Sequence, residues 1–167
     1  MRKVWIFLFV FALLSLVSEY VHADEILCPT GSAYHGADTT QCKDPVTVWL
    51  TTGVRSYHDD RQPGYNENNT GYGLEMRFDG EHAIYVGHYQ NSLYRLTEYV
   101  GYAWQPINVK GVHIGFLNVI ATGYTKTGRG TIIAPVPIAS YDWERIGINA
   151  IIIPSVVTAI QLKVKLY

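Results

Sequence analysis

The sequence lacks an excess of charge of either sign. Its 167 residues include 13 lysines and arginines and 14 aspartates and glutamates, which gives a formal net charge of −1. Proteins that bind nucleic acids usually carry a basic face, and nothing in this chain is basic enough to form one. We therefore expect no nucleic-acid partner.

Long hydrophobic runs are absent after the first 23 residues. One run, residues 4–17, is apolar except for Ser15 and follows Arg2 and Lys3. With the small residue Ala23 before a cleavage point, it predicts a secretory signal peptide over residues 1–23. The run is short for a transmembrane helix, which needs about 20 residues, although an uncleaved anchor is the alternative. A mature chain that enters a membrane would therefore do so as strands.

Cysteine is scarce, since the chain has only Cys28 and Cys42. An exported chain meets an oxidising compartment, so the pair predicts a disulfide that staples an N-terminal segment, residues 24–45. The bridge would close a 15-residue loop, worth about 3 kcal/mol in the loop-entropy model. No Cys-x-x-Cys motif and no set of histidines accompanies the pair, so we expect no metal and no cofactor.

Tyrosine and glycine are plentiful, with 13 and 15 residues, and they punctuate short runs that alternate apolar and polar residues. Such runs, separated by turn residues, are typical of β-strands. We predict eight strands, at residues 46–57, 71–79, 81–90, 93–104, 111–123, 130–139, 144–153 and 156–167. An even number of short strands without helical periodicity indicates an all-β fold, an eight-stranded antiparallel up-and-down transmembrane β-barrel over residues 46–167.

The order of the hairpins predicts which connections share a rim. With both termini periplasmic, the outer rim holds the connections at 58–70, 90–94, 123–130 and 154–155. The periplasmic rim then holds those at 79–80, 105–110 and 140–143. In the last strand, the face with Lys163 and Lys165 is expected to point into the lumen. Residues 131–134 and 148–153 are apolar on both faces, which favours an apolar pocket in the lumen. A soluble barrel with a packed core is the alternative.

Three groups of residues occur at the spacing of one enzyme family. They are Tyr57 with residues 65–67 and 71–74, then residues 91–92 with 101–104, and then residues 137–140 with 153–154. With these anchors, the chain from about residue 49 to residue 154 resembles the lipid A palmitoyltransferases of the Gram-negative outer membrane. The resemblance implies a barrel in the cell outer membrane that moves an acyl chain from a phospholipid to lipid A. Its partners would be phospholipid, lipopolysaccharide and the membrane, and we expect a monomer.

Position by position, the resemblance implies a catalytic role for Ser92, which matches the family's serine. Asn91 stands where the family has an aspartate, and Thr52 stands where it has a histidine. Ala103 stands at the family's glycine on the floor of the acyl pocket, which would make such a pocket shallower.

Two prolines, Pro137 and Pro154, match those that loosen the family's barrel wall where the lipid enters. Proline also has no backbone N–H, so it cannot complete a β-ladder. In lipid, unpaired backbone is tolerated only where it faces a cavity or a ligand. A lateral gate beside these prolines is one interpretation, and a simple strand end at Pro154 is the other.

The altered positions affect the expected chemistry, because Thr52 cannot act as a base near neutral pH. A general base for Ser92 would then come from His58 with Asp59, or from His88. The alternative is that His58 and Asp59 lie in an ordinary solvated loop and that Asn91 and Ser92 form an ordinary hairpin turn. The cations near the outer rim, which would meet the phosphates of lipid A, are Arg95, Lys126 and Arg129.

Three functions follow as hypotheses. The first is an outer-membrane barrel that binds a lipid or acyl chain in its lumen, with acyl transfer to lipid A either lost or rebuilt around Ser92. The second is a non-enzymatic surface barrel, of the kind a phage would encode, that acts through its outer loops. The third is a soluble periplasmic ligand carrier of lipocalin-like build.

Overall fold

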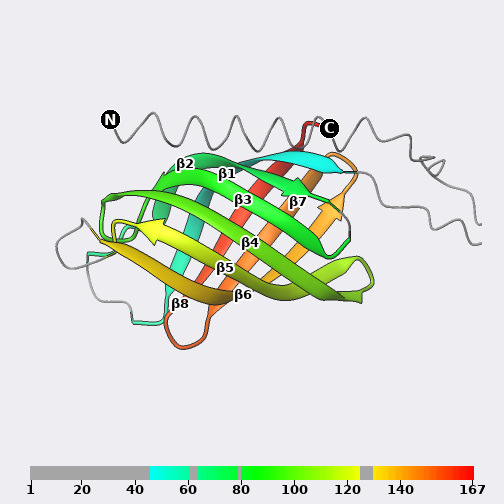
Figure 1. The fold of residues 1–167 in the computed structure, drawn as a ribbon. Helices are drawn as coiled ribbons and strands as arrows, with labels where there is room; N and C mark the ends of the chain where they lie inside the picture. The colour runs from blue at the N-terminus through cyan, green and yellow to red at the C-terminus, as the bar shows by residue number, and fades with distance from the viewer. Residues whose placement is uncertain (1–45, 61–63, 79, 125–129) are drawn as a thin grey trace, which may run out of the picture. The chain divides into compact units, whose positions relative to one another are not determined.

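The computed structural model describes residues 46–60, 64–78, 80–124 and 130–167. They form a closed barrel of eight antiparallel strands, in which each strand pairs with the next and the last pairs with the first (Figure 1). The strands are β1 (Thr47–His58), β2 (Asn68–Arg77), β3 (His82–Gln90), β4 (Leu96–Val109), β5 (Val112–Thr122), β6 (Thr131–Trp143), β7 (Ile146–Ile153) and β8 (Val157–Lys165). The predicted all-β, eight-stranded, up-and-down barrel is confirmed.

Several predicted features lie outside the described residues. They are the signal peptide, the N-terminal segment with Cys28 and Cys42, and the rim cations Lys126 and Arg129. Within the residues that are described, there is no helix long and apolar enough to cross a membrane.

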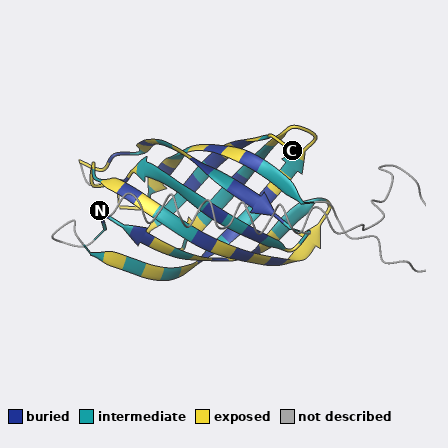
Figure 2. Ribbon diagram, turned by 45° about the horizontal axis from the view of Figure 1, so that its top comes forward, coloured by how far each residue is buried: buried dark blue, intermediate teal, exposed yellow. Residues whose placement is uncertain are grey.

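Burial alternates along the strands, which gives the chequered pattern of Figure 2. In β8, Gln161 and Lys163 are buried in the lumen while Leu162 and Val164 are exposed on the outer wall. This is the period of two that a strand imposes on its side chains. The predicted orientation of the lysine face is therefore confirmed at Lys163.

The connections fall at two ends of the barrel. Residues 110–111 and 144–145 make tight turns at one end, here called the turn end, where β2 also ends, β3 begins, β1 begins and β8 ends. Residues 59–67, 91–95, 123–130 and 154–156 connect strands at the opposite end, here called the loop end. The predicted grouping of the connections agrees with this order.

Two of the predicted turns are wrong in position. β4 continues past the predicted break at 105–110, because a bulge between Trp104 and Ile107 accommodates Pro106 without ending the ladder. The turn falls instead at Lys110 and Gly111, whose φ angles are 53° and 85°, as a two-residue hairpin that follows the twist of the strands requires. β6 likewise runs through the predicted turn at 140–143, and the chain reverses at Glu144.

The outer wall is covered by large apolar side chains. Ile133 is 77% exposed and Trp143 is 60% exposed. Exposed aromatic side chains occur on strands near both ends of the barrel: Tyr57 and Tyr72 towards the loop end, and Tyr102, Trp104, Phe116, Tyr141 and Trp143 towards the turn end. Apolar surface of this extent is unusual on a protein that meets only water.

Candidate functional site

The wall of the barrel is incomplete between β6 and β7. β6 pairs with β5 along its length, from Tyr141 opposite Val112 to Thr131 opposite Thr122. Its ladder with β7 stops at Ile138, which lies opposite Ile151. Residues 131–137 of β6, here called the open edge, therefore have ladder partners on one side only among the described strands.

Two prolines lie on the open edge. Pro135 and Pro137 face Asn118 and Phe116 across the β5–β6 ladder. Since they are two residues apart, both turn the ring nitrogen towards the same neighbour, and the intact β5 ladder shows that this neighbour is β7. Their rings replace two N–H groups that would otherwise be unpaired there. Pro135 was not singled out in the sequence.

Pro154 has a different position from Pro137. It directly follows β7 and lies in the turn to β8, in which the Val156 N–H donates to the Ile153 carbonyl at 3.0 Å. Ser155 in the same turn has a φ of 60°. Of the two interpretations of Pro154, its position fits the strand end, whereas Pro137 belongs to the open edge.

The lumen beside the open edge is lined by apolar side chains. Six of them form one buried cluster: Ala83, Tyr85, Ala103, Leu117, Val136 and Ile138. Half-buried residues pack against this cluster, namely Tyr99, Val119, Ala134, Ile151 and Ile153. Both sets come from β3 to β7, so the apolar half of the lumen adjoins the gap in the wall.

Tyr99 extends from β4 towards β2 and β3, where two glycines leave room for its hydroxyl. A Cβ added to Gly87 would lie 2.7 Å from the Tyr99 hydroxyl, and one added to Gly73 would lie closer still. The two glycines thus give the hydroxyl room against β2 and β3. The same hydroxyl interacts with Thr51 on β1 and Gln161 on β8, so the Tyr99 side chain reaches across the lumen.

Ala103 lies deeper, in the apolar cluster. It is fully buried and pairs with Ala83 on one side and Leu117 on the other. With Tyr85, these residues close the apolar half of the lumen below Tyr99. A ligand that enters from the loop end or the open edge would meet them as its floor.

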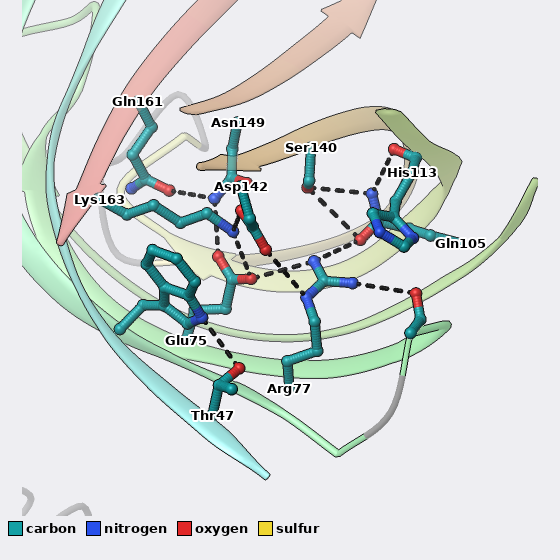
Figure 3. A network of polar contacts seen from close by, with 12 residues as sticks. Thr47, Glu75, Arg77, Gln105, His113, Ser140, Asp142, Asn149, Gln161 and Lys163 are labelled. Carbon is teal, nitrogen blue, oxygen red and sulfur yellow. Dashed lines mark hydrogen bonds and ion pairs between the residues drawn. The ribbon is translucent and has the colours of Figure 1, made fainter. Parts of the chain in front are cut away.

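A charged layer, formed by Glu75, Arg77, Asp142 and Lys163, adjoins this floor near the turn end, since Glu75 and Arg77 lie opposite Tyr85 and Ala83 in the β2–β3 ladder (Figure 3). The Lys163 ammonium lies 2.7 Å from Glu75 Oε1 and 2.7 Å from Asp142 Oδ1. The Arg77 guanidinium lies 3.0 Å from Glu75 Oε1 and 3.7 Å from Asp142 Oδ2. Two cations thus balance two carboxylates inside the barrel.

Neutral polar side chains complete this layer. Asn149 donates to Glu75 Oε2 at 2.9 Å, and Arg77 donates to Gln105 Oε1 at 2.9 Å. The Gln105 amide in turn donates to Ser140 Oγ at 3.0 Å. Buried charges are tolerated only when they are paired, and every charge of this network has an opposite partner. Arg77 Nε and Asp142 Oδ1 take part in ion pairs but make no hydrogen bond with the described residues.

The charged layer was mostly missed in the sequence. Only the lysine face of the last strand was expected in the lumen. Glu75 and Arg77 show the same pattern as the lysine face, because they are charged residues two positions apart in a predicted strand. The lumen-facing position of Asp142 could not be predicted, because the residue fell in a predicted turn that is in fact part of β6.

Asn91 organises the turn between β3 and β4 at the loop end. Its side-chain oxygen accepts hydrogen bonds from the Leu93 and Arg95 N–H groups at 2.9 and 3.0 Å. Its amide donates to Thr97 Oγ1 at 3.0 Å and to the Gly123 carbonyl at 3.2 Å. The side chain is fully buried and all its hydrogen-bonding groups are occupied. This geometry gives Asn91 a structural role.

Ser92 follows in the same turn and is half-buried. Its carbonyl accepts a hydrogen bond from the Asn66 N–H at 2.9 Å. Its hydroxyl makes no hydrogen bond with another described residue. The position predicted for the nucleophile is therefore at the loop end, with its hydroxyl uncommitted within the described part of the chain.

His58 lies at the same end of the barrel. Its ring stacks on Tyr65, with centroids 4.3 Å apart and planes at 14°. Its Nδ1 is buried and has no hydrogen-bond partner among the described residues. His58 and Asn66 both line a rim pocket of about 530 Å³, so Asn66 links this pocket to Ser92. No direct contact of His58 with Ser92 occurs within the described residues.

The remaining predicted residues are not assembled around Ser92. His88 lies on β3 and meets the exposed Tyr72 ring edge-on at 4.2 Å, so it faces the outer wall. The Thr52 hydroxyl donates to the Gly53 carbonyl at 2.8 Å and accepts from the Leu162 N–H at 3.2 Å, which supports the β1 bulge. The Arg95 backbone belongs to the Asn91 turn.

No protein-family model and no curated protein matches this chain. The geometry of the barrel itself therefore indicates what this protein can do.

Proposed function

We propose that this protein is an outer-membrane β-barrel that binds a lipid acyl chain in its lumen, and that the acyl chain enters sideways across the open edge of β6. The observation that carries the proposal is the open edge with its two prolines beside the apolar cluster of the lumen. Each feature alone has an ordinary explanation. Together they would form a passage from the hydrocarbon of the membrane to an apolar pocket in the lumen.

The backbone chemistry of the open edge supports this passage. In lipid, each unpaired N–H or C=O group costs several kcal/mol, so a barrel normally closes every ladder. At Pro135 and Pro137 the N–H groups are absent, which lowers the cost of leaving the wall unpaired. The open edge also carries apolar side chains on both faces, with Ile133 on the outer wall and Val136 in the lumen. An acyl chain would meet no charged group there.

The outer wall supports the membrane setting. Aromatic side chains near both ends, with aliphatic side chains between them, are the arrangement of membrane-spanning barrels. In that setting the loop end would face outwards, because the longer connections of bacterial barrels lie on the extracellular side.

Binding without acyl transfer is the form of this function that the geometry supports best. A nucleophilic serine needs a base that contacts it and a group that orients the base. Asn91 is occupied by the turn, Thr52 by the bulge, and His88 faces the outer wall. His58 is the remaining candidate base, at a rim pocket next to Asn66.

Photolabelling tests the binding proposal. Refolded full-length mature protein would be exposed to a phospholipid with a diazirine at the end of one acyl chain, and the adducts located by mass spectrometry. We expect adducts on lumen residues of β6 and β7. Ile151→Trp should abolish them because the new ring fills the lumen, whereas Ile152→Trp should not, because Ile152 faces outwards. Equal labelling of both variants would contradict the proposal.

Mass spectrometry of lipid A from cells that express the protein tests acyl transfer separately. An added acyl chain that disappears in Ser92→Ala would establish transfer at Ser92. Unchanged lipid A together with positive photolabelling would leave a lipid-binding barrel. Unchanged lipid A with no lumen labelling would favour the non-enzymatic surface barrel.

A further inference from the structure

The charged layer spans the lumen from several sides. Its ionic side chains come from β2, β6 and β8, and its amide partners come from β4 and β7. On β1, the Trp49 ring lies 4.7 Å from the Lys163 ammonium. On β7, a Cβ added to Gly147 would lie 2.7 Å from Lys163 Cε, so the lysine stem also fills the space against that strand. The layer leaves little room for an ion to pass.

Solvent reaches this layer from one side. The side chains of Glu75 and Lys163 are 0% exposed, whereas that of Asp142 is 21% exposed. Asp142 is also close to the turn end, since it is the penultimate residue of β6. The layer therefore separates the turn-end mouth of the barrel from the lumen above it.

A polar lane continues from the layer towards the loop end, on the side of the lumen away from the apolar cluster. Gln161 accepts a hydrogen bond from Asn149 at 3.3 Å, and Ser56 and Asn69 are joined at 2.7 Å further along the wall. The Asn149 carbonyl oxygen is buried and has no hydrogen-bond partner among the described residues. Buried polar groups of this kind are usually satisfied by water.

We propose that the charged layer is an electrostatic gate across an ion path along this polar lane, that the gate is shut in this structure, and that Lys163 is its moving part. Lys163 contacts both carboxylates at 2.7 Å, so its departure breaks two ion pairs at once. Arg77 is held more firmly, by Gln105 and by the Gly80 carbonyl as well as by Glu75. This activity is separate from lipid binding, which uses the apolar half of the lumen.

The charge count predicts the selectivity of the open state. Without the Lys163 ammonium, two carboxylates face one guanidinium, and the layer carries one net negative charge. A carboxylate left without its partner in a buried site draws in water and a counter-ion. The open gate therefore conducts cations in preference to anions. With Lys163 in place the layer is neutral and closed.

Single-channel recording in planar bilayers tests the gate, with refolded full-length mature protein in a potassium chloride gradient. We expect rare, brief openings in the wild type. Lys163→Met should raise the mean conductance about tenfold or more, with a cation-selective reversal potential. Lys165→Met is the matched control, because Lys165 is on the same face of the same strand but makes no ion pair with the described residues. It should behave as the wild type does.

Two further variants separate a gate from a damaged barrel. Glu75→Gln combined with Lys163→Met leaves one guanidinium and one carboxylate, so the conductance should return towards the wild-type value. Asp142→Asn leaves two cations and one carboxylate, so the current through this variant should favour anions. This variant also tests the gate if Lys163→Met does not fold. The proposal is overturned if Lys163→Met conducts no more than the wild type or the control. It is also overturned if Asp142→Asn favours cations.

Discussion

Replacement of Asn91 by alanine tests whether this residue is part of the fold or of the chemistry. The change removes four hydrogen bonds of the buried side chain: those from the Leu93 and Arg95 N–H groups, and those to Thr97 Oγ1 and the Gly123 carbonyl. A typical intramolecular hydrogen bond contributes about 1 kcal/mol net, so the loss should be about 2–4 kcal/mol of unfolding free energy. The lower value applies if water reaches the freed N–H groups.

Asn91→Asp is the matched control. It keeps the oxygen that accepts from Leu93 and Arg95, but it loses both amide donors and directs a carboxylate oxygen at the Gly123 carbonyl. We expect an intermediate loss of about 1–2 kcal/mol. Both values would be measured by urea unfolding in lipid vesicles, followed by tryptophan fluorescence. If Asn91→Ala unfolds with the same free energy as the wild type, the structural role assigned to Asn91 is wrong.

Two other predictions follow from the packing at the loop end and the glycines of the lumen. Gly87→Ala would place a methyl group 2.6 Å from the backbone of Gly73, so it should destabilise the barrel by about 1–3 kcal/mol in the same unfolding assay. Gly101→Ala should destabilise it less, because its closest new neighbour is the end of the flexible Leu117 side chain. Burial raises the pKa of Tyr124, whose hydroxyl lies 2.7 Å from that of Tyr89. The folded state then keeps a proton that the unfolded chain loses near pH 10, so the unfolding free energy should fall as the pH rises above about 10. A tyrosinate absorbance titration in which Tyr124→Phe matches the wild type would contradict this.

The strands could be predicted because each one carries its own pattern. In β8, lysines and glutamine alternate with aliphatic residues, and a period of two has only one structural interpretation at that length. The strand ends were harder to predict. Pro106 resembles a strand break in the sequence, but the bulge between Trp104 and Ile107 absorbs it. Only the neighbouring strand decides between a break and a bulge.

The candidate site was predictable in part for the same reason. Pro137 was singled out because a missing N–H is a property of the residue itself, wherever it lies. The open edge could not be predicted, because it depends on how far β7 extends beside β6. The role of Asn91 could not be predicted either, since its partners are Thr97 on β4 and Gly123 in the connection after β5.

By itself, the sequence determined the fold class, the strand count, the order of the rims and the lumen-facing position of Lys163. These properties are local, because the period of two and the turn residues act within a few positions of the chain. Only the tertiary structure decided that Lys163 meets Glu75 and Asp142, and that the ladder between β6 and β7 stops at Ile138. Ion pairs across a lumen and the reach of one strand along another depend on closure of the barrel, which brings together residues that are far apart in the chain.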